Sequence, residues 1–386
     1  MDEKKIDDLL TRGVVEIIDK DDLRKKLLRG QKLRIKLGID PTSPDLHIGR
    51  AVALLKMRDF QQLGHQAVLI VGDFTAVIGD TSDKDSERPM LKREVIEKNK
   101  KTYFEQIGKL IDLKSAELRY NSEWLEPLTY REIGEHADQF SVADFIARDV
   151  IKRRLETGKR VSLREVLYPL MQGYDSVAVR ADVELGGLDQ KFNLLAGRTL
   201  QERMGQIPQS IVMNPLIEGL DGRKMSSSWG NTISLNLEPA DMYGKVMSMN
   251  DTEVPVYFTL CTRVPLEEAG EIWKCHPKEA KMRLAREIVA LYHGEAAAVK
   301  AESNWEKTFS EGEAPTDIPE VVVVRGETIQ KALTYVVVSK SEQKRLADAG
   351  ALSEVGGEKI HDLMAPIEKE FTLRIGKHRF IKITIK

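Results

Sequence analysis

The stretch from residue 35 to residue 50 constrains the fold more than any other part of the chain. It begins with a short apolar run, Ile35 to Ile39, which is typical of a buried parallel strand. Two prolines and the Asp and Ser side chains of residues 40–45 then end the strand with turn chemistry. Asp45 is a good N-cap for the helix whose apolar spacing follows. We therefore expect a strand, a tight turn and a helix N-terminus in succession.

This arrangement predicts an anion site, because unpaired N–H groups and the helix dipole point at the same place. The imidazole of His47 can donate a hydrogen bond to a phosphate, and Gly49, which lacks a Cβ atom, lets a flat nucleotide approach the backbone. An ordinary strand–helix unit with a surface histidine has the same local pattern. The stretch alone therefore suggests a nucleotide site without establishing one.

Composition limits the class of protein. The 386 residues suffice for two or three domains, and a net charge of −2 does not announce nucleic-acid binding, so any basic surface must be local. Two cysteines, Cys261 and Cys275, make no disulfide framework, which suits a reducing cytoplasm. We see no signal-peptide core, no apolar run long enough for a membrane helix and no metal-ligand cluster. We expect a cytoplasmic protein with no membrane segment and no protein-held metal.

The first half of the chain alternates apolar strands with amphipathic helices, which predicts an α/β fold with a Rossmann-like parallel sheet. A second strand is expected at 67–71. The polar loop 78–88 comes shortly after its carboxyl end, where open α/β sheets bind ligands. Further strands are expected at 118–120, 181–185 and 211–215. Helices are expected within 6–30 and at 92–111, 127–136, 141–156, 162–178 and 190–204.

The helix predicted from Ser162 carries a second group of polar side chains. Tyr168, Gln172 and Asp175 are spaced i, i+4 and i+7, so they share one helical face. A phenol, an amide and a carboxylate there could bind the ammonium and the phenolic hydroxyl of an amino acid. An exposed polar stripe is the alternative, and the apolar residues around these three disfavour it.

Two later segments also suit a nucleotide. Gly186 to Gln190 follows a short strand, where glycines let the backbone approach a ribose and Asp189 can bind its hydroxyls. The loop 220–231 is rich in glycine, serine and cations, so it is suited to wrapping a triphosphate.

Taken together, these motifs resemble the class I aminoacyl-tRNA synthetases, and among them the bacterial-type tyrosyl-tRNA synthetases. Residues 46–49, Leu-His-Ile-Gly, resemble the His-Ile-Gly-His signature, with Arg50 in place of the last histidine. Residues 224–228, Lys-Met-Ser-Ser-Ser, resemble the Lys-Met-Ser-Lys-Ser signature, with Ser227 in place of the second lysine. Both stand in the family's order around a tyrosine-type group of side chains.

The resemblance implies a two-step reaction. The carboxylate of L-tyrosine attacks the α-phosphate of ATP, which arrives with Mg²⁺, and the tyrosyl group then passes to the 3′ end of tRNA(Tyr). Positioning and charge stabilisation would provide the catalysis. The implied catalytic residues are His47, Arg50, Lys84, Arg88, Lys224 and Ser227. The implied ATP-binding residues are Asp40, Thr42, His47, Gly49, Gly187, Asp189, Met213, Lys224, Met225, Ser226 and Ser227.

The resemblance also implies a tyrosine pocket, in which Asp80 and Asp175 flank the phenolic hydroxyl and accept its hydrogen bond. Phenylalanine would leave these acceptors unpaired, so the pocket should reject it. Two positions depart from the family pattern, since Lys36 stands where a tyrosine is usual and Glu184 where many relatives have glutamine. The implied tyrosine-binding residues are Lys36, Thr75, Asp80, Tyr168, Gln172, Asp175 and Gln190.

The rest of the chain fits the same resemblance. Residues 1–234 would be the catalytic domain, 235–312 a helical anticodon-binding domain, 313–326 an acidic linker and 327–386 a small α+β RNA-binding module. Helices are expected at 239–249, 255–262, 266–273, 277–293, 295–309, 327–336 and 341–349, and strand structure at 374–385. In the last segment eleven Lys and Arg against eight Asp and Glu give a net charge of +3, which suits RNA phosphates.

The family also implies a homodimer, with residues 120–165 as the expected interface. A tryptophan-specific relative is the first alternative, although two acceptors, Asp80 and Asp175, exceed the need of one indole N–H. An RNA-binding paralogue without activation is the second, motivated by Arg50, Ser227 and Lys36 and opposed by the intact His47, Asp189 and Lys224. ATP–pyrophosphate exchange distinguishes these alternatives.

Overall fold

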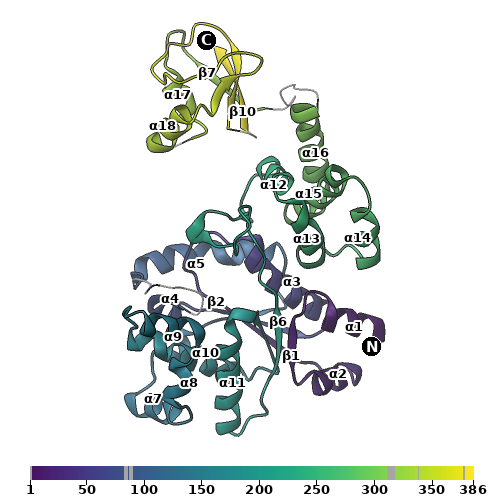
Figure 1. Cartoon of the computed structure of the whole chain (residues 1–386), viewed down its shortest axis with the longest axis vertical. Helices are drawn as coiled ribbons and strands as arrows, with labels where there is room; N and C mark the ends of the chain where they lie inside the picture. Colours follow the sequence, from purple (N-terminus) through teal and green to yellow (C-terminus); the bar gives the residue numbers. More distant parts are fainter. Residues whose placement is uncertain (1, 82–85, 87–89, 311–317, 338, 377–378) are drawn as a thin grey trace. The chain divides into compact units, whose positions relative to one another are not determined.

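The computed structural model describes residues 2–81, 86, 90–310, 318–337, 339–376 and 379–386. The chain forms two compact units (Figure 1). The first contains residues 1–236 and 252–270, and the second contains residues 237–251 and 271–386. Among the helices in these ranges, none is both long enough and apolar enough to cross a membrane.

The first unit is built on a six-stranded sheet with the strand order β1-β6-β5-β2-β3-β4. Strands β2 to β6 pair in parallel, and only β1 runs antiparallel to its neighbour β6. This confirms the Rossmann-like parallel sheet. The strands are β1 Glu16–Ile18, β2 Arg34–Ile39, β3 Gln66–Val71, β4 Glu117–Tyr120, β5 Val183–Gly187 and β6 Ser210–Asn214.

The order of the sheet determines where a ligand can bind. The chain passes from β2 to β3 on one side and later returns to pair β5 with the other edge of β2. Such a reversal leaves a crevice beyond the carboxyl ends of the two central strands. Strand β2 ends at Ile39, and the turn that follows it lies at this crevice. The glycines at the end of β5 lie there too.

Helices cover both faces of the sheet. Figure 1 shows α3 (Ile48–Gln62) and α5 (Arg93–Gly108) on one side, with α10 (Leu163–Val179) and α11 (Lys191–Arg203) on the other. The N-terminus of α10 has the predicted capping box of Ser162 and Glu165. The remaining helices of this part are α1 Glu3–Thr11, α2 Lys20–Leu28, α4 Thr75–Ile78, α6 Ser122–Leu125, α7 Tyr130–Ala137, α8 Val142–Ile146, α9 Asp149–Glu156 and α13 Val254–Cys261.

Three local predictions are wrong. The segment 6–30 contains the strand β1 between its helices. This strand has only three residues, too few for the sequence pattern to indicate it. Asp45 does not cap α3, because that helix begins at Ile48 with His47 at the N-cap; the carboxylate of Asp45 instead accepts from Asn236 at 2.8 Å. The helix expected at 141–156 is two helices, α8 and α9, because residues 147 and 148 form the C-cap of the first and the N-cap of the second.

The second unit contains a helical part and a small sheet. Helices α12 (Pro239–Met247), α15 (Pro277–His293) and α16 (Glu295–Ser310) pack on one another, in agreement with the predicted helices. Helix α14 (Leu266–Trp273) begins in the first unit and ends in the second. The sheet has the order β7-β10-β9-β8, and β7 lies inside the range predicted as a linker. Its elements are β7 Glu320–Val323, α17 Ile329–Leu333, α18 Lys340–Asp348, β8 Leu352–Glu354, β9 Phe371–Ile375 and β10 Arg379–Ile385.

The C-terminal module has its own apolar core. Buried side chains from both helices and all four strands pack together there, as in an independent small domain. The core includes Val323 of β7, Leu333 of α17, Leu352 of β8, Leu373 of β9 and Ile383 of β10.

Candidate active site

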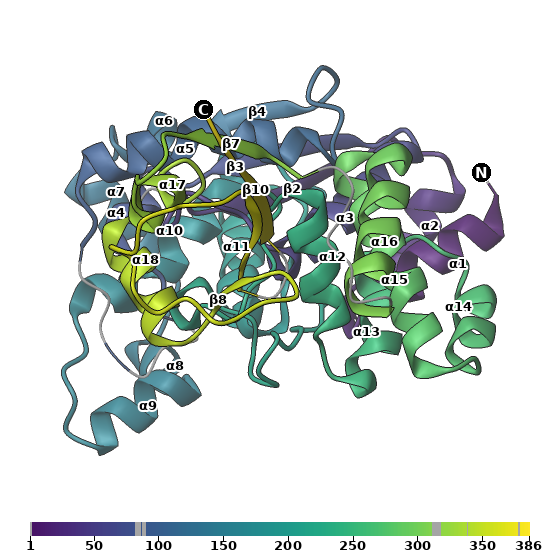
Figure 2. The same ribbon diagram turned by 90° about the horizontal axis from the view of Figure 1, so that it is seen from above.

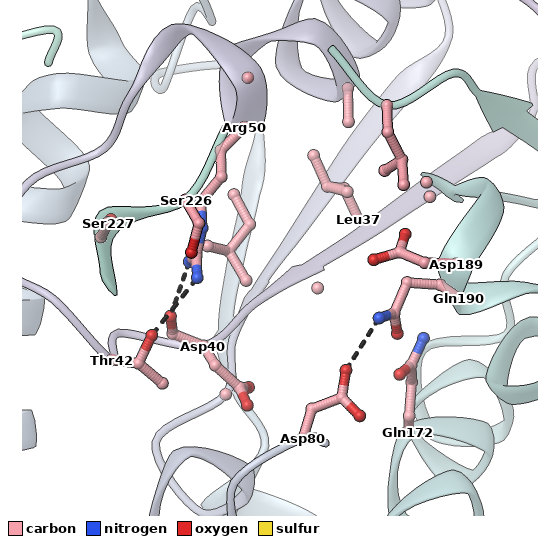
Figure 3. Close-up of a pocket in the computed structure, with 18 of the residues that line it drawn as sticks. Leu37, Asp40, Thr42, Arg50, Asp80, Gln172, Asp189, Gln190, Ser226 and Ser227 are labelled. Atoms are coloured by element: carbon pink, nitrogen blue, oxygen red, sulfur yellow. Dashed lines mark hydrogen bonds between the residues drawn. The ribbon is translucent and has the colours of Figure 1, made fainter. Parts of the chain in front are cut away.

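A cavity with a volume of about 730 Å³ opens at the carboxyl ends of β2 and β5. It is lined by the turn after β2, the start of α3, one face of α10, the glycines of β5 and the loop 214–229. Figure 3 shows two groups of polar side chains in it: Arg50, Thr42 and Ser226 lie at one end, while Asp80, Gln172 and Gln190 lie at the other. The sheet thus brings both predicted signature segments and the predicted amino-acid pocket to one cavity.

His47 and Gly49, predicted to bind an anion, line this cavity. A Cβ atom on Gly49 would lie 3.1 Å from His47 Nδ1 and 3.2 Å from Met225 Sδ. A glycine at this position therefore leaves space beside the His47 and Met225 side chains. Burial, with the cations Arg50 and Lys224 nearby, lowers the pKa of His47 to about 3. The imidazole is therefore neutral at physiological pH and can donate one hydrogen bond. Its Nδ1 has no hydrogen-bond partner among the described residues.

Arg50 reaches back across the turn that precedes its helix. Its guanidinium donates to the carbonyl oxygen of Asp40 at 3.0 Å and to Thr42 Oγ1 at 3.3 Å (Figure 3). These bonds hold a permanent positive charge beside the start of α3, where phosphate oxygens are favoured. An arginine therefore keeps a cationic donor at the position where the signature has its second histidine.

The second signature segment closes onto the segment after β5. Lys224 Nζ lies 2.8 Å from Asp189 Oδ2, which joins the two residues predicted to bind phosphate and ribose. Asn231 organises the backbone of this loop, because its Oδ1 accepts from the Ser226 N–H at 2.8 Å and its Nδ2 donates to the Lys224 carbonyl at 3.1 Å. Sequence reasoning missed Asn231, although it ends the very loop that was singled out.

The base of the loop is tied to α13. Tyr257 is fully buried and its hydroxyl donates to the carbonyl oxygen of Glu218 at 2.7 Å. The backbones of Glu218 and Lys224 pair as an isolated antiparallel β-bridge. The helix that follows the signature loop therefore helps to hold the lysine in place, a role that sequence spacing did not indicate.

Asp40 is a buried carboxyl group shared by both ends of the cavity. It accepts from Thr75 Oγ1 at 2.8 Å and from the Tyr168 hydroxyl at 2.9 Å. Burial raises the pKa of Asp40 to about 6, and the two hydrogen bonds oppose that shift. A Cβ atom on Gly72 would lie 2.1 Å from this carboxyl group, so only glycine fits at the end of β3. Three predicted site residues thus meet through direct contacts.

Asp175 is held by two side chains that sequence reasoning missed. Trp124 Nε1 donates to Asp175 Oδ1 at 2.8 Å, and Asn121 Nδ2 lies 3.4 Å from Oδ2. Burial raises the pKa of Asp175 to about 7, while the Lys36 ammonium acts in the opposite direction. Both donors follow the carboxyl end of β4, so their position at a strand end was a usable signal.

A chain of side-chain amides connects Gln172, Asn193 and Gln190 to Asp80. Gln190 Nε2 donates to Asp80 Oδ2 at 2.8 Å (Figure 3). Asn193 Nδ2 donates to Gln172 Oε1 at 3.1 Å and to Gln190 Oε1 at 2.9 Å. Asp80, Gln172 and Asp175 all line the cavity, as predicted.

Some predicted site residues do not line the cavity. Lys36 is buried behind its wall, and Leu37 and Ile39 are the β2 side chains that line it. Met213 packs in the apolar core with Leu194 and Ile211. Lys84 and Arg88 lie outside the described residues. The predicted residues that do line it are Asp40, Thr42, His47, Gly49, Arg50, Thr75, Asp80, Tyr168, Gln172, Asp175, Gly187, Asp189, Gln190, Lys224, Met225, Ser226 and Ser227.

Comparisons with known proteins identify relatives along nearly the whole chain. The family model described as tRNA synthetases class I (W and Y) matches residues 28–310. The chain is 44% identical to the tyrosine–tRNA ligase of Carboxydothermus hydrogenoformans over 97% of both chains. It is also 44% identical to the tyrosine–tRNA ligase of Thermotoga maritima over 97% of this chain and 96% of the relative.

Solved structures support the fold. Tyrosyl-tRNA synthetase of Archaeoglobus fulgidus, complexed with L-tyrosine, matches with a TM-score of 0.63 and 22% identity over 78% of this chain and 100% of that chain. A C-terminally truncated mitochondrial tyrosyl-tRNA synthetase of Coccidioides posadasii matches with a TM-score of 0.65 and 24% identity over 78% of this chain and 91% of that chain.

Proposed function

The chain belongs to the class I tRNA synthetases for tryptophan and tyrosine, and from this premise we propose that it activates L-tyrosine with ATP and transfers the tyrosyl group to the 3′ end of tRNA(Tyr). One observation carries the proposal. A single cavity is lined by both signature segments and by the carboxyl groups of Asp80 and Asp175. It therefore joins a site for phosphates to a site for a phenol.

The phenolic hydroxyl of tyrosine binds between Asp80 and Asp175. Asp175 is pinned by Trp124 and Asn121, so it cannot turn away when the substrate lacks a hydroxyl. A buried carboxylate that loses a donor is left with an unmet desolvation penalty. Phenylalanine is therefore rejected by the acceptors that hold tyrosine.

Gln172 and Gln190 bind the polar end of the amino acid. Their amides are already oriented by Asn193, which donates to both side-chain oxygens. An oriented amide loses little freedom when a ligand arrives, so it positions the ammonium and carboxylate groups with small entropic loss. The carboxylate then lies toward the nucleotide end of the cavity.

The nucleotide end stabilises the charge that develops during activation. The tyrosine carboxylate oxygen bonds to the α-phosphorus of Mg–ATP, and the bond from that phosphorus to the bridging oxygen breaks, which releases pyrophosphate. His47 donates a neutral hydrogen bond, while Arg50 and Lys224 supply positive charge to the phosphate oxygens. Lys84 and Arg88 are proposed as further cations. The ribose hydroxyls bind Asp189 in place of the Lys224 ammonium, which can then leave its ion pair with Asp189 and bind the phosphates.

Transfer to tRNA uses the rest of the chain. We assign residues 1–234 to catalysis, 235–312 to anticodon recognition and 327–386 to RNA binding. The C-terminal assignment is supported by the independent core of that module and by its net charge of +3, from eleven basic and eight acidic residues. A reducing cytoplasm is the proposed location, in keeping with two unpaired cysteines.

A homodimer is proposed through residues 120–165, which contain α7, α8 and α9. Several apolar side chains of this segment are exposed, among them Tyr130 at 96%, Val142 at 72% and Leu163 at 71%. Figure 2 shows α8 and α9 extending away from the body of the first unit. Exposed apolar patches of this kind mark interfaces. Light scattering after gel filtration should give the dimer mass for the native chain and the monomer mass for Val142→Asp with Leu163→Asp.

ATP–pyrophosphate exchange tests the proposed activity. The purified chain should exchange pyrophosphate in the presence of tyrosine and not of tryptophan or phenylalanine. Exchange with tryptophan alone would favour the tryptophan-specific relative. A folded chain that binds tRNA and gives no exchange with any of the three would instead be an RNA-binding paralogue, and the proposal would be wrong.

A further inference from the structure

The two sequence departures in the amino-acid pocket contact each other. Lys36 on β2 and Glu184 on β5 are partners in the register of the sheet. Their side chains are 0% and 2% exposed, and Lys36 Nζ lies 2.8 Å from Glu184 Oε1. The lysine and the glutamate that depart from the family pattern described above are therefore one buried ion pair.

All three ammonium donors of Lys36 and both carboxylate oxygens of Glu184 have hydrogen-bonding partners. Lys36 Nζ also donates to Ser176 Oγ at 2.7 Å and to the Gln172 carbonyl oxygen at 3.0 Å. An ammonium has three donors, so each has a partner here. Glu184 Oε2 accepts from Ser176 Oγ at 3.1 Å and from Gln209 Nε2. Three further residues, Ser176, Gln172 and Gln209, thus hold the geometry of the pair.

The network supports the turn of α10 that carries the substrate contacts. Gln172 and Asp175 line the cavity, and the ammonium holds the backbone of Gln172 and the side chain of Ser176 from behind. Glu184 itself lines the cavity wall. Removal of either charge alone would leave its partner buried and unpaired, which proteins tolerate poorly, whereas removal of both leaves no orphaned charge.

We propose that Lys36 and Glu184 act as one positioning unit that sets the amino-acid end of the cavity for tyrosine, because the ion pair holds Gln172 in place and keeps Asp175 an acceptor. This inference rests on the proposed tyrosine activation. It assigns to Lys36 a role behind the pocket instead of direct contact with the substrate.

Electrostatics supports the same role. The charged and titratable groups that act on Asp175 are Lys36 from β2, Glu184 from β5 and the Tyr168 phenol from α10, beside the donors Trp124 and Asn121. Burial raises the pKa of Asp175, Lys36 lowers it and Glu184 raises it. Loss of Lys36 alone should therefore raise the pKa of Asp175 further, and loss of Glu184 alone should lower it.

A double-mutant cycle tests the unit. Lys36→Met, Glu184→Gln and the double variant are compared with the native chain by tyrosine- and phenylalanine-dependent pyrophosphate exchange over a range of pH. Each single variant should raise the KM for tyrosine about tenfold or more, with the KM for ATP changed less than about twofold. The acidic limb of the tyrosine KM profile should move to higher pH in Lys36→Met and to lower pH in Glu184→Gln. The double variant should raise the KM for tyrosine by no more than either single variant, because the contacts to Gln172 and Ser176 are lost only once.

Lys56→Met is the matched control. Lys56 is also a buried lysine, at 2% exposure, and its ammonium donates to the carbonyl oxygens of Leu9 and Arg12 at 2.7 and 2.8 Å. Its loss should lower the melting temperature without changing the tyrosine-to-phenylalanine ratio or the pH profile. Equal effects of Lys36→Met and Lys56→Met would show a merely structural role.

The outcomes separate the two levels of inference. Single variants with native tyrosine KM and native pH profiles, or a double variant in which the losses add, would overturn the positioning unit. If the single variants do not fold, the double variant decides, since a raised tyrosine KM with a native KM for ATP supports the unit and a native tyrosine KM refutes it. A native chain without tyrosine-dependent exchange would refute the proposed function itself.

Discussion

Replacement of Asn231 by alanine should weaken ATP use while leaving tyrosine binding intact. The side chain is buried within the loop that carries Lys224 and Ser226. Its Oδ1 accepts from the Ser226 N–H at 2.8 Å, and its Nδ2 donates to the Lys224 carbonyl at 3.1 Å and to Asp221 Oδ1 at 2.7 Å. The hydrogen bond from Asn231 is the largest cause that lowers the pKa of Asp221 to about 2.

The magnitude follows from the neutral hydrogen bonds. Asn231→Ala removes the bonds to the Ser226 N–H and to the Lys224 carbonyl, each worth about 1 kcal/mol. If the loop keeps both bonds in the transition state, the loss of about 2 kcal/mol appears as a decrease of about 30-fold in kcat/KM for ATP. Tyrosine binding in the absence of ATP should not change, because Asn231 does not line the amino-acid end of the cavity.

Pyrophosphate exchange at saturating tyrosine and varied ATP measures this effect, and equilibrium dialysis measures tyrosine binding. Asn236→Ala is the control, since that exposed amide, near the end of the same segment, donates from Nδ2 to Asp45 Oδ1 at 2.8 Å. The reasoning fails if both variants keep the native kcat/KM for ATP. It also fails if Asn231→Ala weakens tyrosine binding as much as it weakens ATP use.

Three further outcomes are expected. Asp175→Asn should greatly reduce the preference for tyrosine over phenylalanine, because an amide presents a donor where the phenol needs an acceptor; exchange with each amino acid measures it. The KM for tyrosine should rise as the pH falls below about 7, because burial raises the pKa of Asp175 to about 7 and only the carboxylate accepts the phenol; KM values from acidic to alkaline pH measure it. Removal of residues 319–386 should weaken tRNA binding at low salt and leave tyrosine-dependent exchange intact, as filter binding and exchange can show.

Each of these expectations has a clear contrary result. Native selectivity in Asp175→Asn would mean that the phenol is recognised elsewhere. A tyrosine KM that is constant across neutral pH would mean that Asp175 is not the titrating acceptor. Unchanged tRNA affinity after removal of the C-terminal module would assign tRNA binding to the remaining chain.

Local patterns in the sequence determined the elements and the chemistry of the cavity. The apolar run of β2, the capping box of α10 and the bounds of α14 and α15 follow from neighbouring residues, so they could be predicted without a structure. The spacing of Tyr168, Gln172 and Asp175 likewise places them on one helical face whatever that helix packs against. Both signature segments could be found in the sequence because each consists of consecutive residues.

Only the tertiary structure decided how those groups are supported. Alternation along β2 puts Lys36 and Leu37 on opposite faces, but the sequence does not say which face borders the cavity. Trp124 and Asn121 meet Asp175 from 51 and 54 residues away, and Lys36 meets Glu184 through the pairing of β2 with β5. These contacts depend on strand order and helix packing, which bring together residues that share no local pattern. The sequence therefore determines which groups are present, and the packed sheet determines which of them touch the substrate and which hold the others in place.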